Sequence, residues 1–273
     1  MNTHTNDNAV KSLPVFQILT ASLRLPFQNA ATILRLGWPY LLVALILPVL
    51  AAQYVNVAFN LVLLPFIIAT SVLAGVACHQ IFLCPKEQVQ QLSPFRWGKS
   101  EADFFVAGLK LIFALIVGLL VTVGFGSLVV NIADIKVVPV TEYFGYNVLE
   151  WAGMLLFGFV FSRISFILPG AAVGRYFNFN TSWAATKPYA LRLFFVISFV
   201  PIIVATTVNR LSLLMSDTVE QDLGLQLAMS CLSVVGAVIE LCILSKSFEW
   251  VTSQMPEDNP EPNIEQDSAP TQL

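Results

Sequence analysis

Residues 36–85 decide the fold, and they read LGWPYLLVALILPVLAAQYVNVAFNLVLLPFIIATSVLAGVACHQIFLCP. This stretch contains no lysine, arginine, aspartate or glutamate, and His79 is its single histidine. A helix needs about 20 apolar residues to cross hydrocarbon that is about 30 Å thick. The stretch is therefore too long for one membrane span and fits two. We expect a hairpin of two spans with a turn near Asn56 to Asn60.

The whole chain has the composition of a membrane protein. Its 273 residues are 56% hydrophobic and only 11% charged, and the mean hydropathy is +0.75. A soluble core of this size cannot bury that much apolar surface. We predict an all-α fold, a polytopic membrane protein with a bundle of six transmembrane helices and interfacial amphipathic helices. The transmembrane domain covers 36–250, with spans at about 36–56, 60–83, 104–130, 149–173, 193–209 and 225–245.

The distribution of basic residues predicts the orientation of these spans. Short loops that are rich in lysine and arginine stay on the cytoplasmic side of a membrane. Six spans place ten bases on one side and leave only Lys136 and Arg210 on the other. This predicts a multi-pass protein whose N- and C-termini are both cytoplasmic. The ten bases are Lys11, Arg24, Arg35, Lys86, Arg96, Lys99, Arg175, Lys187, Arg192 and Lys246.

The net charge of -3 comes from the C-terminal end of the chain. Five acids lie in the last 20 residues, which hold no base, and the rest of the chain has 14 bases against 12 acids. So weak a balance argues against nucleic-acid binding, for which a basic patch is typical. We expect 251–273 to be a disordered acidic tail and 1–12 to be a disordered N-terminus.

Residues 13–35 precede the first span and have the pattern of a helix that lies on the membrane surface. Polar residues recur there every three or four positions on a background of leucine, phenylalanine and isoleucine. Pro26 is expected to bend or divide this amphipathic interfacial helix. A shorter segment, Thr181–Lys187, precedes the fifth span in a similar way.

Arg163 and Glu240 are the clearest ionisable residues inside the predicted spans. Each costs about 2.5 to 3.5 kcal/mol at the bilayer centre on insertion scales. Their depths below the cytoplasmic border differ by about 9 Å, a gap that a long arginine side chain can close. One hypothesis is a candidate intramembrane polar pair on a substrate or proton path. The alternatives are a structural ion pair, or an arginine that extends to the inner headgroups.

Four further positions are candidates for helix packing or helix kinks: Pro169, Gly170, Gly174 and Pro201. A proline removes a backbone donor and can open a helix, and broken helices line sites in many transporters. Gly170 and Gly174 have the small-xxx-small spacing that permits close helix contact. Both features are also common in helices that only pack, so the structural interpretation stays open beside the functional one.

The sequence predicts no enzyme, no cofactor and no metal site. It contains no HExxH, GxSxG or Walker A motif and no close carboxylate pair within a predicted span. Its four cysteines lack CxxC spacing, and only two histidines are present. We expect the cysteines to act as small hydrophobic residues.

Two segments carry a resemblance to known proteins. Residues 161–169 read FSRISFILP and precede a run of glycine and alanine, and 180–192 read NTSWAATKPYALR. Over 155–205 the chain resembles a group of uncharacterised polytopic bacterial inner-membrane proteins. These are similar to the membrane domain attached to some glycerophosphodiester phosphodiesterases. The resemblance implies a bacterial inner membrane, and we do not expect phosphodiesterase activity from it.

Two classes of function are consistent with these features. The first is a non-enzymatic accessory or scaffold protein, in contact with the lipid bilayer and with a membrane-protein partner. It would depend on cytoplasmic loops such as Phe95–Lys99 and Trp183–Lys187, and the scarcity of polar residues in the spans favours it. The second is a small transporter, or a lipid- or metabolite-handling protein, that uses Arg163 and Glu240.

Overall fold

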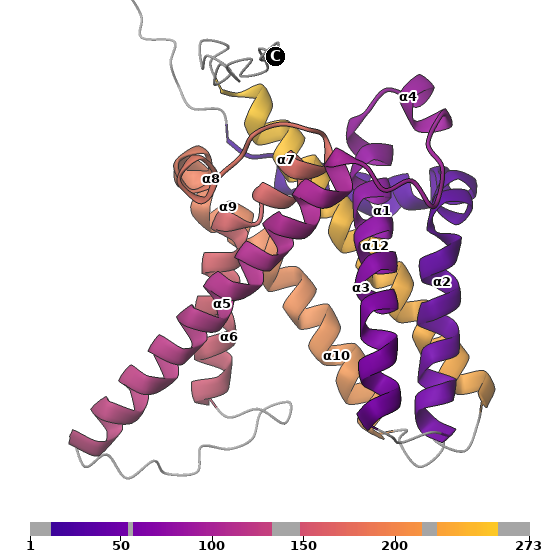
Figure 1. Cartoon of the computed structure of the whole chain (residues 1–273). Coiled ribbons are helices and arrows are strands. Elements are labelled where there is room, and N and C mark those ends of the chain that lie inside the picture. The colour runs from indigo at the N-terminus through magenta and orange to yellow at the C-terminus, as the bar shows by residue number, and fades with distance from the viewer. Residues whose placement is uncertain (1–11, 54–56, 133–147, 215–222, 256–273) are drawn as a thin grey trace, which may run out of the picture.

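A computed structural model of the chain describes residues 12–53, 57–132, 148–214 and 223–255 (Figure 1). All regular structure in these ranges is helical, which confirms the all-α prediction. The longer helices are α2 (Ala30–Gln53), α3 (Val57–Leu83), α5 (Lys99–Ile132), α6 (Val148–Ile164), α10 (Val200–Leu214) and α12 (Leu223–Ser253). The shorter ones are α1 (Val15–Gln28), α4 (Lys86–Gln90), α7 (Ile167–Ala172), α8 (Phe179–Thr186) and α9 (Ala190–Phe194).

Several of these helices are long and apolar enough to cross a membrane. Among the described residues there are four such stretches: Leu63–Leu83, Trp151–Ala172, Phe179–Val208 and Gly224–Ser253. A fifth is α1 together with Ala30–Ile46, if this pair, which is bent by 78°, forms one span. Helix α5 is outside this set, and its first turns carry Lys99, Glu101 and Asp103.

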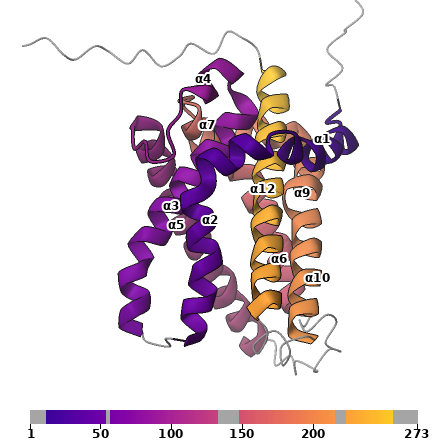
Figure 2. The same ribbon diagram turned by 90° about the vertical axis from the view of Figure 1, so that its right-hand side faces the viewer.

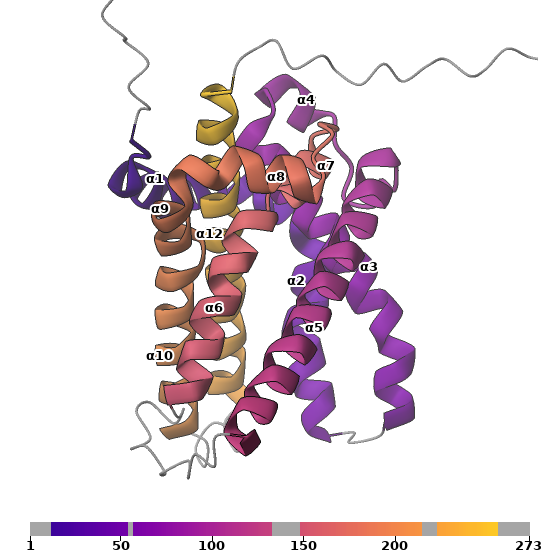
Figure 3. The ribbon, with the colours of Figure 1, turned by 90° about the vertical axis from the view of Figure 1, so that its left-hand side faces the viewer.

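The helices run between two ends of the molecule. Helix α1, α4, α7, α8 and the C-terminal end of α12 lie together at one end, which we call the polar end (Figure 1). Helix α1 lies across the neighbouring helices there (Figure 2), and α8 lies across the upper end of α6 (Figure 3). The described parts of the chain therefore begin and finish at the same end.

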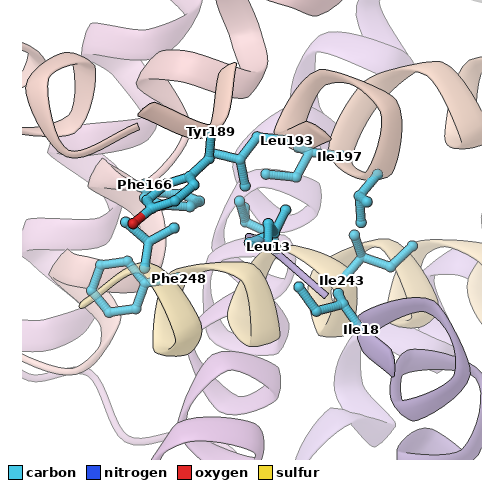
Figure 4. Packing of buried hydrophobic residues seen from close by; sticks show 11 residues of the cluster. Leu13, Ile18, Phe166, Tyr189, Leu193, Ile197, Ile243 and Phe248 are labelled. Carbon is cyan, nitrogen blue, oxygen red and sulfur yellow. The ribbon is translucent and has the colours of Figure 1, made fainter. Parts of the chain in front are cut away.

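The largest buried cluster joins α12 to α1, α9 and the start of α7 (Figure 4). Phe166 packs edge-on against Phe248, with ring centroids 5.6 Å apart, and both side chains are almost fully buried. Burial of an aromatic ring of this size is worth about 1.5 to 3 kcal/mol relative to exposure in water. The other buried members are Leu13, Ile18, Tyr189, Leu193, Val196, Ile197, Ile243, Leu244 and Val251.

The expected span at 149–173 is broken between α6 and α7. After α7 the chain turns at Gly174, where φ is +72°, a value that favours glycine. The amide of Arg175 donates to the carbonyl of Gly170 at 2.9 Å, and the amide of Gly174 donates to that of Ala171 at 3.2 Å. These two bonds form a Schellman motif, which closes the C-terminal end of α7.

Gly170 permits a close approach of the chain that follows this turn. A Cβ atom at Gly170 would lie 2.9 Å from the Cβ of Phe177 and 3.2 Å from the carbonyl oxygen of Arg175. Pro169, beside it, is buried within α7. The Pro169–Gly174 segment thus brings Phe177 back against the buried cluster, where its ring meets Phe248 at 5.1 Å.

Pro201 follows a turn of π-helix at Phe195–Phe199. Proline has no amide hydrogen and clashes with the carbonyl four residues earlier, here that of Ile197. In the wider turn the amide of Val200 donates to the carbonyl of Phe195. Within the same turn the Ser198 hydroxyl donates to the carbonyl of Gly158 in α6 at 2.6 Å. The irregular turn therefore fixes the contact between α6 and the following helix.

The N-terminal boundary differs from the predicted one. The chain bends at Asn29 instead of near Arg35, and α2 begins at Ala30. The Asn29 side-chain amide donates to the carbonyl of Leu25 at 2.9 Å and satisfies one of the free carbonyls at the end of α1. Pro26 lies inside α1, near its end.

The predicted terminal segments fall mostly outside the described residues. Residues 1–11 and 256–273 are not described, so the expected disorder of 1–12 and of 251–273 stays a prediction for nearly all of their length. Helix α12 continues to Ser253, beyond the predicted end of the sixth span at 245.

Gly170→Ala is expected to lower the free energy of unfolding by about 1 to 3 kcal/mol, because the added methyl group meets backbone and a Cβ atom. Gly153→Ala in α6 is the matched control, since nothing lies within 4 Å of its added Cβ. It is expected to be neutral or slightly stabilising. Thermal unfolding in detergent measures both. Equal midpoints for the two variants would contradict the close approach.

Candidate functional site

Arg163 lies in the last turn of α6 and is 4% exposed. Its Nε donates to the Thr186 hydroxyl at 2.7 Å, and its Nη2 donates to the carbonyl of Trp183. The guanidinium carbon also lies 4.3 Å from the centroid of the Trp183 ring, in a cation–π contact. Helix α8 thus supplies polar and aromatic partners to this buried charge.

The backbone of Arg163 is bound by the same helix. The Ser182 hydroxyl donates to the carbonyl of Arg163 at 2.7 Å. This carbonyl is near the end of α6, where helical partners run out. Residues 161–169 and 180–192 therefore meet in space through Arg163, Ser182 and Thr186.

Helix α8 is well placed for this role because its own start is capped. The Asn178 side-chain oxygen accepts a hydrogen bond from the amide of Thr181 at 2.8 Å. Asparagine is among the best residues at this position. The cap fixes the start of α8, so Ser182 and Thr186, one helical turn apart, both reach Arg163.

The structure does not bring Arg163 and Glu240 together. Glu240 lies on α12 with an exposed side chain, whereas Arg163 is covered by α8. Across the described residues the ion pair that forms is Lys246 with Glu249, at 2.6 Å. An Arg163–Glu240 pair is therefore not part of this structure.

A second buried polar contact, which sequence reasoning missed, joins α3 to α12. His79 is fully buried, and its Nδ1 lies 2.7 Å from the Ser245 hydroxyl oxygen. Ser245 also bonds to the carbonyl of Leu241 at 2.7 Å. The His79 Nε2 has no partner among the described residues. In the sequence, the only sign of this contact is a single histidine inside a long apolar run. Its position does not indicate which residue it contacts.

A cavity of about 310 Å³ opens at the polar end, between α3, α4, the start of α5 and the end of α7. We call it the α4 cavity. Its polar lining comes from Gln80, Cys84, Gln88, Gln91, Arg96 and Ser100. Burial raises the pKa of the Cys84 thiol, and the charge of the nearby Arg175 offsets part of this rise. The sequence shows no motif for this cavity, because four separate segments form it.

Within the described residues no cluster of three or more histidine, cysteine, aspartate or glutamate side chains is arranged to hold a metal ion. Comparison of the chain with protein-family models, with curated proteins and with solved structures gives no match.

Arg163→Ala is expected to lower the free energy of unfolding by about 2 to 4 kcal/mol. The change removes two charge-assisted hydrogen bonds and the cation–π contact with Trp183, all at a buried position. Glu240→Gln is expected to leave the free energy of unfolding unchanged or to raise it, because Glu240 faces outward on an apolar helix and the change removes a charge there. Thermal unfolding of the single and double variants measures both effects. Strong non-additivity in the double variant would support an Arg163–Glu240 pair and contradict this assignment.

Proposed function

We propose that this chain is a non-enzymatic accessory protein of a bacterial inner membrane, which crosses the bilayer six times with both ends in the cytoplasm. The observation that carries the proposal is the binding of Arg163 by α8. A transport site built on Arg163 and Glu240 needs a charge that faces a substrate path. In this chain the charge is used to hold one helix against another.

The course of the helices supports six spans. The crossings would be α2, α3, α5, the pair α6 and α7, the continuous run through α9 and α10, and α12. Helix α5 has 34 residues, a length of about 51 Å, which exceeds the hydrocarbon thickness. Apart from Lys110, its exposed side chains between residues 106 and 120 are apolar, as expected for contact with lipid: Val106, Leu109, Ile112, Phe113, Ile116, Val117 and Leu120.

Helix α1 has the three faces expected of a helix at the membrane surface. Ile18, Ser22 and Pro26 are buried against the protein. A second face exposes Phe16, Leu23 and Phe27, which are 83%, 56% and 67% exposed. A third, polar face exposes Gln17, Arg24 and Gln28. A helix that packs on a bundle, dips into the interface and meets water needs these three faces, so α1 supports a membrane boundary at the polar end.

The predicted orientation is tested with reporter fusions. Alkaline phosphatase fused after Leu273 is expected to be inactive, and green fluorescent protein fused there is expected to fluoresce, because both report a cytoplasmic C-terminus. Alkaline phosphatase inserted within 215–222 is expected to be active. The opposite result at either position contradicts six spans with both ends inside.

The loop before α5 supports a docking role. Phe95 and Trp97 are 62% and 52% exposed at the polar end, and Phe95 packs edge-on against Trp38 at 5.2 Å. Arginine and aromatic residues are enriched at protein interfaces. The other cytoplasmic candidate, Trp183–Lys187, already uses Trp183 and Thr186 to hold Arg163. We therefore place the partner on Phe95–Lys99.

Photo-crosslinking tests this surface. A benzophenone side chain in place of Phe95 or Trp97 is expected to give a discrete protein adduct in membranes of the native bacterium. The same side chain in place of Phe113, which is 69% exposed on α5, is the control and is expected to give lipid adducts. Lipid adducts alone at all three positions would contradict the accessory function.

A further inference from the structure

We propose that the α4 cavity binds a phosphate ester at the cytoplasmic surface of the membrane. Arg96 belongs both to this cavity and to the Phe95–Lys99 docking segment, but binding in the cavity does not require a protein partner. The ligand class is a phosphate group that carries hydroxyl-bearing or other polar substituents. The proposal rests on the size of the cavity, on its lining and on the side chains that hold its walls.

The lining of the cavity favours an anion. No aspartate or glutamate lines it, and Arg96 does. The Arg96 guanidinium makes no hydrogen bond or ion pair within the described ranges, so its fork of donors is available. An arginine fork matches the oxygens of phosphate. A volume of about 310 Å³ is at the lower end of the range for small-molecule sites.

The side chains that hold the walls of the cavity also donate hydrogen bonds to carbonyl groups at helix ends. Carbonyl groups at the ends of helices repel anions. The Arg35 guanidinium donates to the carbonyls of Val89 and Gln90, at 3.0 and 3.3 Å, and so occupies the end of α4. The Gln80 side-chain amide donates to the carbonyl of Ala172 at 2.9 Å and occupies the end of α7. These hydrogen bonds hold the cavity walls in place. They also provide donors for three carbonyl groups at helix ends, which would otherwise be free to repel an anion.

The Glu101 carboxylate lies beside the cavity and accepts a hydrogen bond from the backbone. Glu101 lines a smaller adjoining cavity that shares Gln80, Leu92 and Arg96 with this one. Its Oε2 accepts a hydrogen bond from the amide of Gly98 at 2.8 Å. The charge of Arg175 acts on Cys84, which lines the cavity. The lining side chains themselves carry one positive charge, on Arg96, and no carboxylate.

The remaining polar side chains extend the ligand class beyond simple phosphate. Gln88, Gln91 and Ser100 line the cavity and offer both donors and acceptors, which suits hydroxyl groups. Gln80 lies in the last turn of α3, at the end of an apolar helix, so the cavity opens at the expected level of lipid headgroups. A phosphoglycerol headgroup and a soluble phosphate ester share this chemistry.

Two arms of one experiment distinguish these sources. Purified full-length protein is titrated with glycerol 3-phosphate and, separately, studied by native mass spectrometry with phosphatidylglycerol against phosphatidylcholine. We expect saturable binding in at least one arm, and Arg96→Gln to weaken it by about tenfold or more. Arg24→Gln, an exposed arginine on α1 outside the cavity, is the control and is expected to bind as the parent does. Binding of the soluble ester alone identifies a metabolite, and retention of the lipid alone identifies a headgroup.

A second pair of variants protects the test against a folding artefact. Gln88 is exposed on α4, so Gln88→Glu and Gln88→Lys should both fold. Gln88→Glu is expected to weaken binding and Gln88→Lys to strengthen it, each by several-fold, since the new charges lie on the cavity wall. The site is overturned if neither probe binds the parent. It is equally overturned if Arg96→Gln binds like the Arg24→Gln control.

Discussion

The buried guanidinium of Arg163 is the constraint on which the polar end of the molecule depends. A cation removed from water requires hydrogen-bond partners or a counter-charge. Within the described residues its partners are hydroxyl, carbonyl and aromatic groups of α8, not a carboxylate. Because Thr186 and Trp183 both come from this short helix, α8 must lie across the end of α6. The chain then has only Lys187–Tyr189 in which to turn into α9.

The departures from regular α-helix gather close to this constraint. Helix α6 ends directly after Arg163, and its free carbonyl is taken by Ser182. The π-helical turn before Pro201 packs on the same helix through Ser198 and Gly158. Irregular turns of this kind are common at functional sites, yet here each one has a packing reason. The irregular geometry therefore supports an interpretation of α6 to α9 as a fixed structural unit.

Sequence reasoning located elements along the chain better than contacts between them. The expected span at 60–83 corresponds closely to α3 (Val57–Leu83), because charges and Pro85 mark the end of a long apolar run. The depth of Arg163 and Glu240 along their helices was also accessible from the sequence. Their rotation about the helix axes was not, since the spans are apolar on nearly every side. Arg163 turns toward α8 and Glu240 faces outward, so similar depth did not produce a pair.

The buried contact of His79 with Ser245 shows the same limit. The two residues are 166 positions apart and have no pattern in common. Such contacts are difficult to predict in long apolar helices, because one histidine or one serine barely changes the hydropathy of the run. Only the packing of α3 on α12 reveals the pair. The expectation that the four cysteines act as small hydrophobic residues needed no partner: Cys78 and Cys242 are buried, whereas Cys84 is half-buried and Cys231 is exposed.

Arg96 has two proposed roles, one in the orientation of the chain in the membrane and one in the binding of a ligand. As a base in a loop that is predicted to be cytoplasmic, it contributes to the predicted orientation, and for that purpose any position on that side of the membrane is sufficient. Orientation does not require a cavity, a wall held by Arg35, or the absence of carboxylates from the lining. These features act only on a molecule that enters the cavity. The distribution of charge along the sequence predicts the side of the membrane on which Arg96 lies, and the cavity around Arg96 is the basis for the proposed ligand.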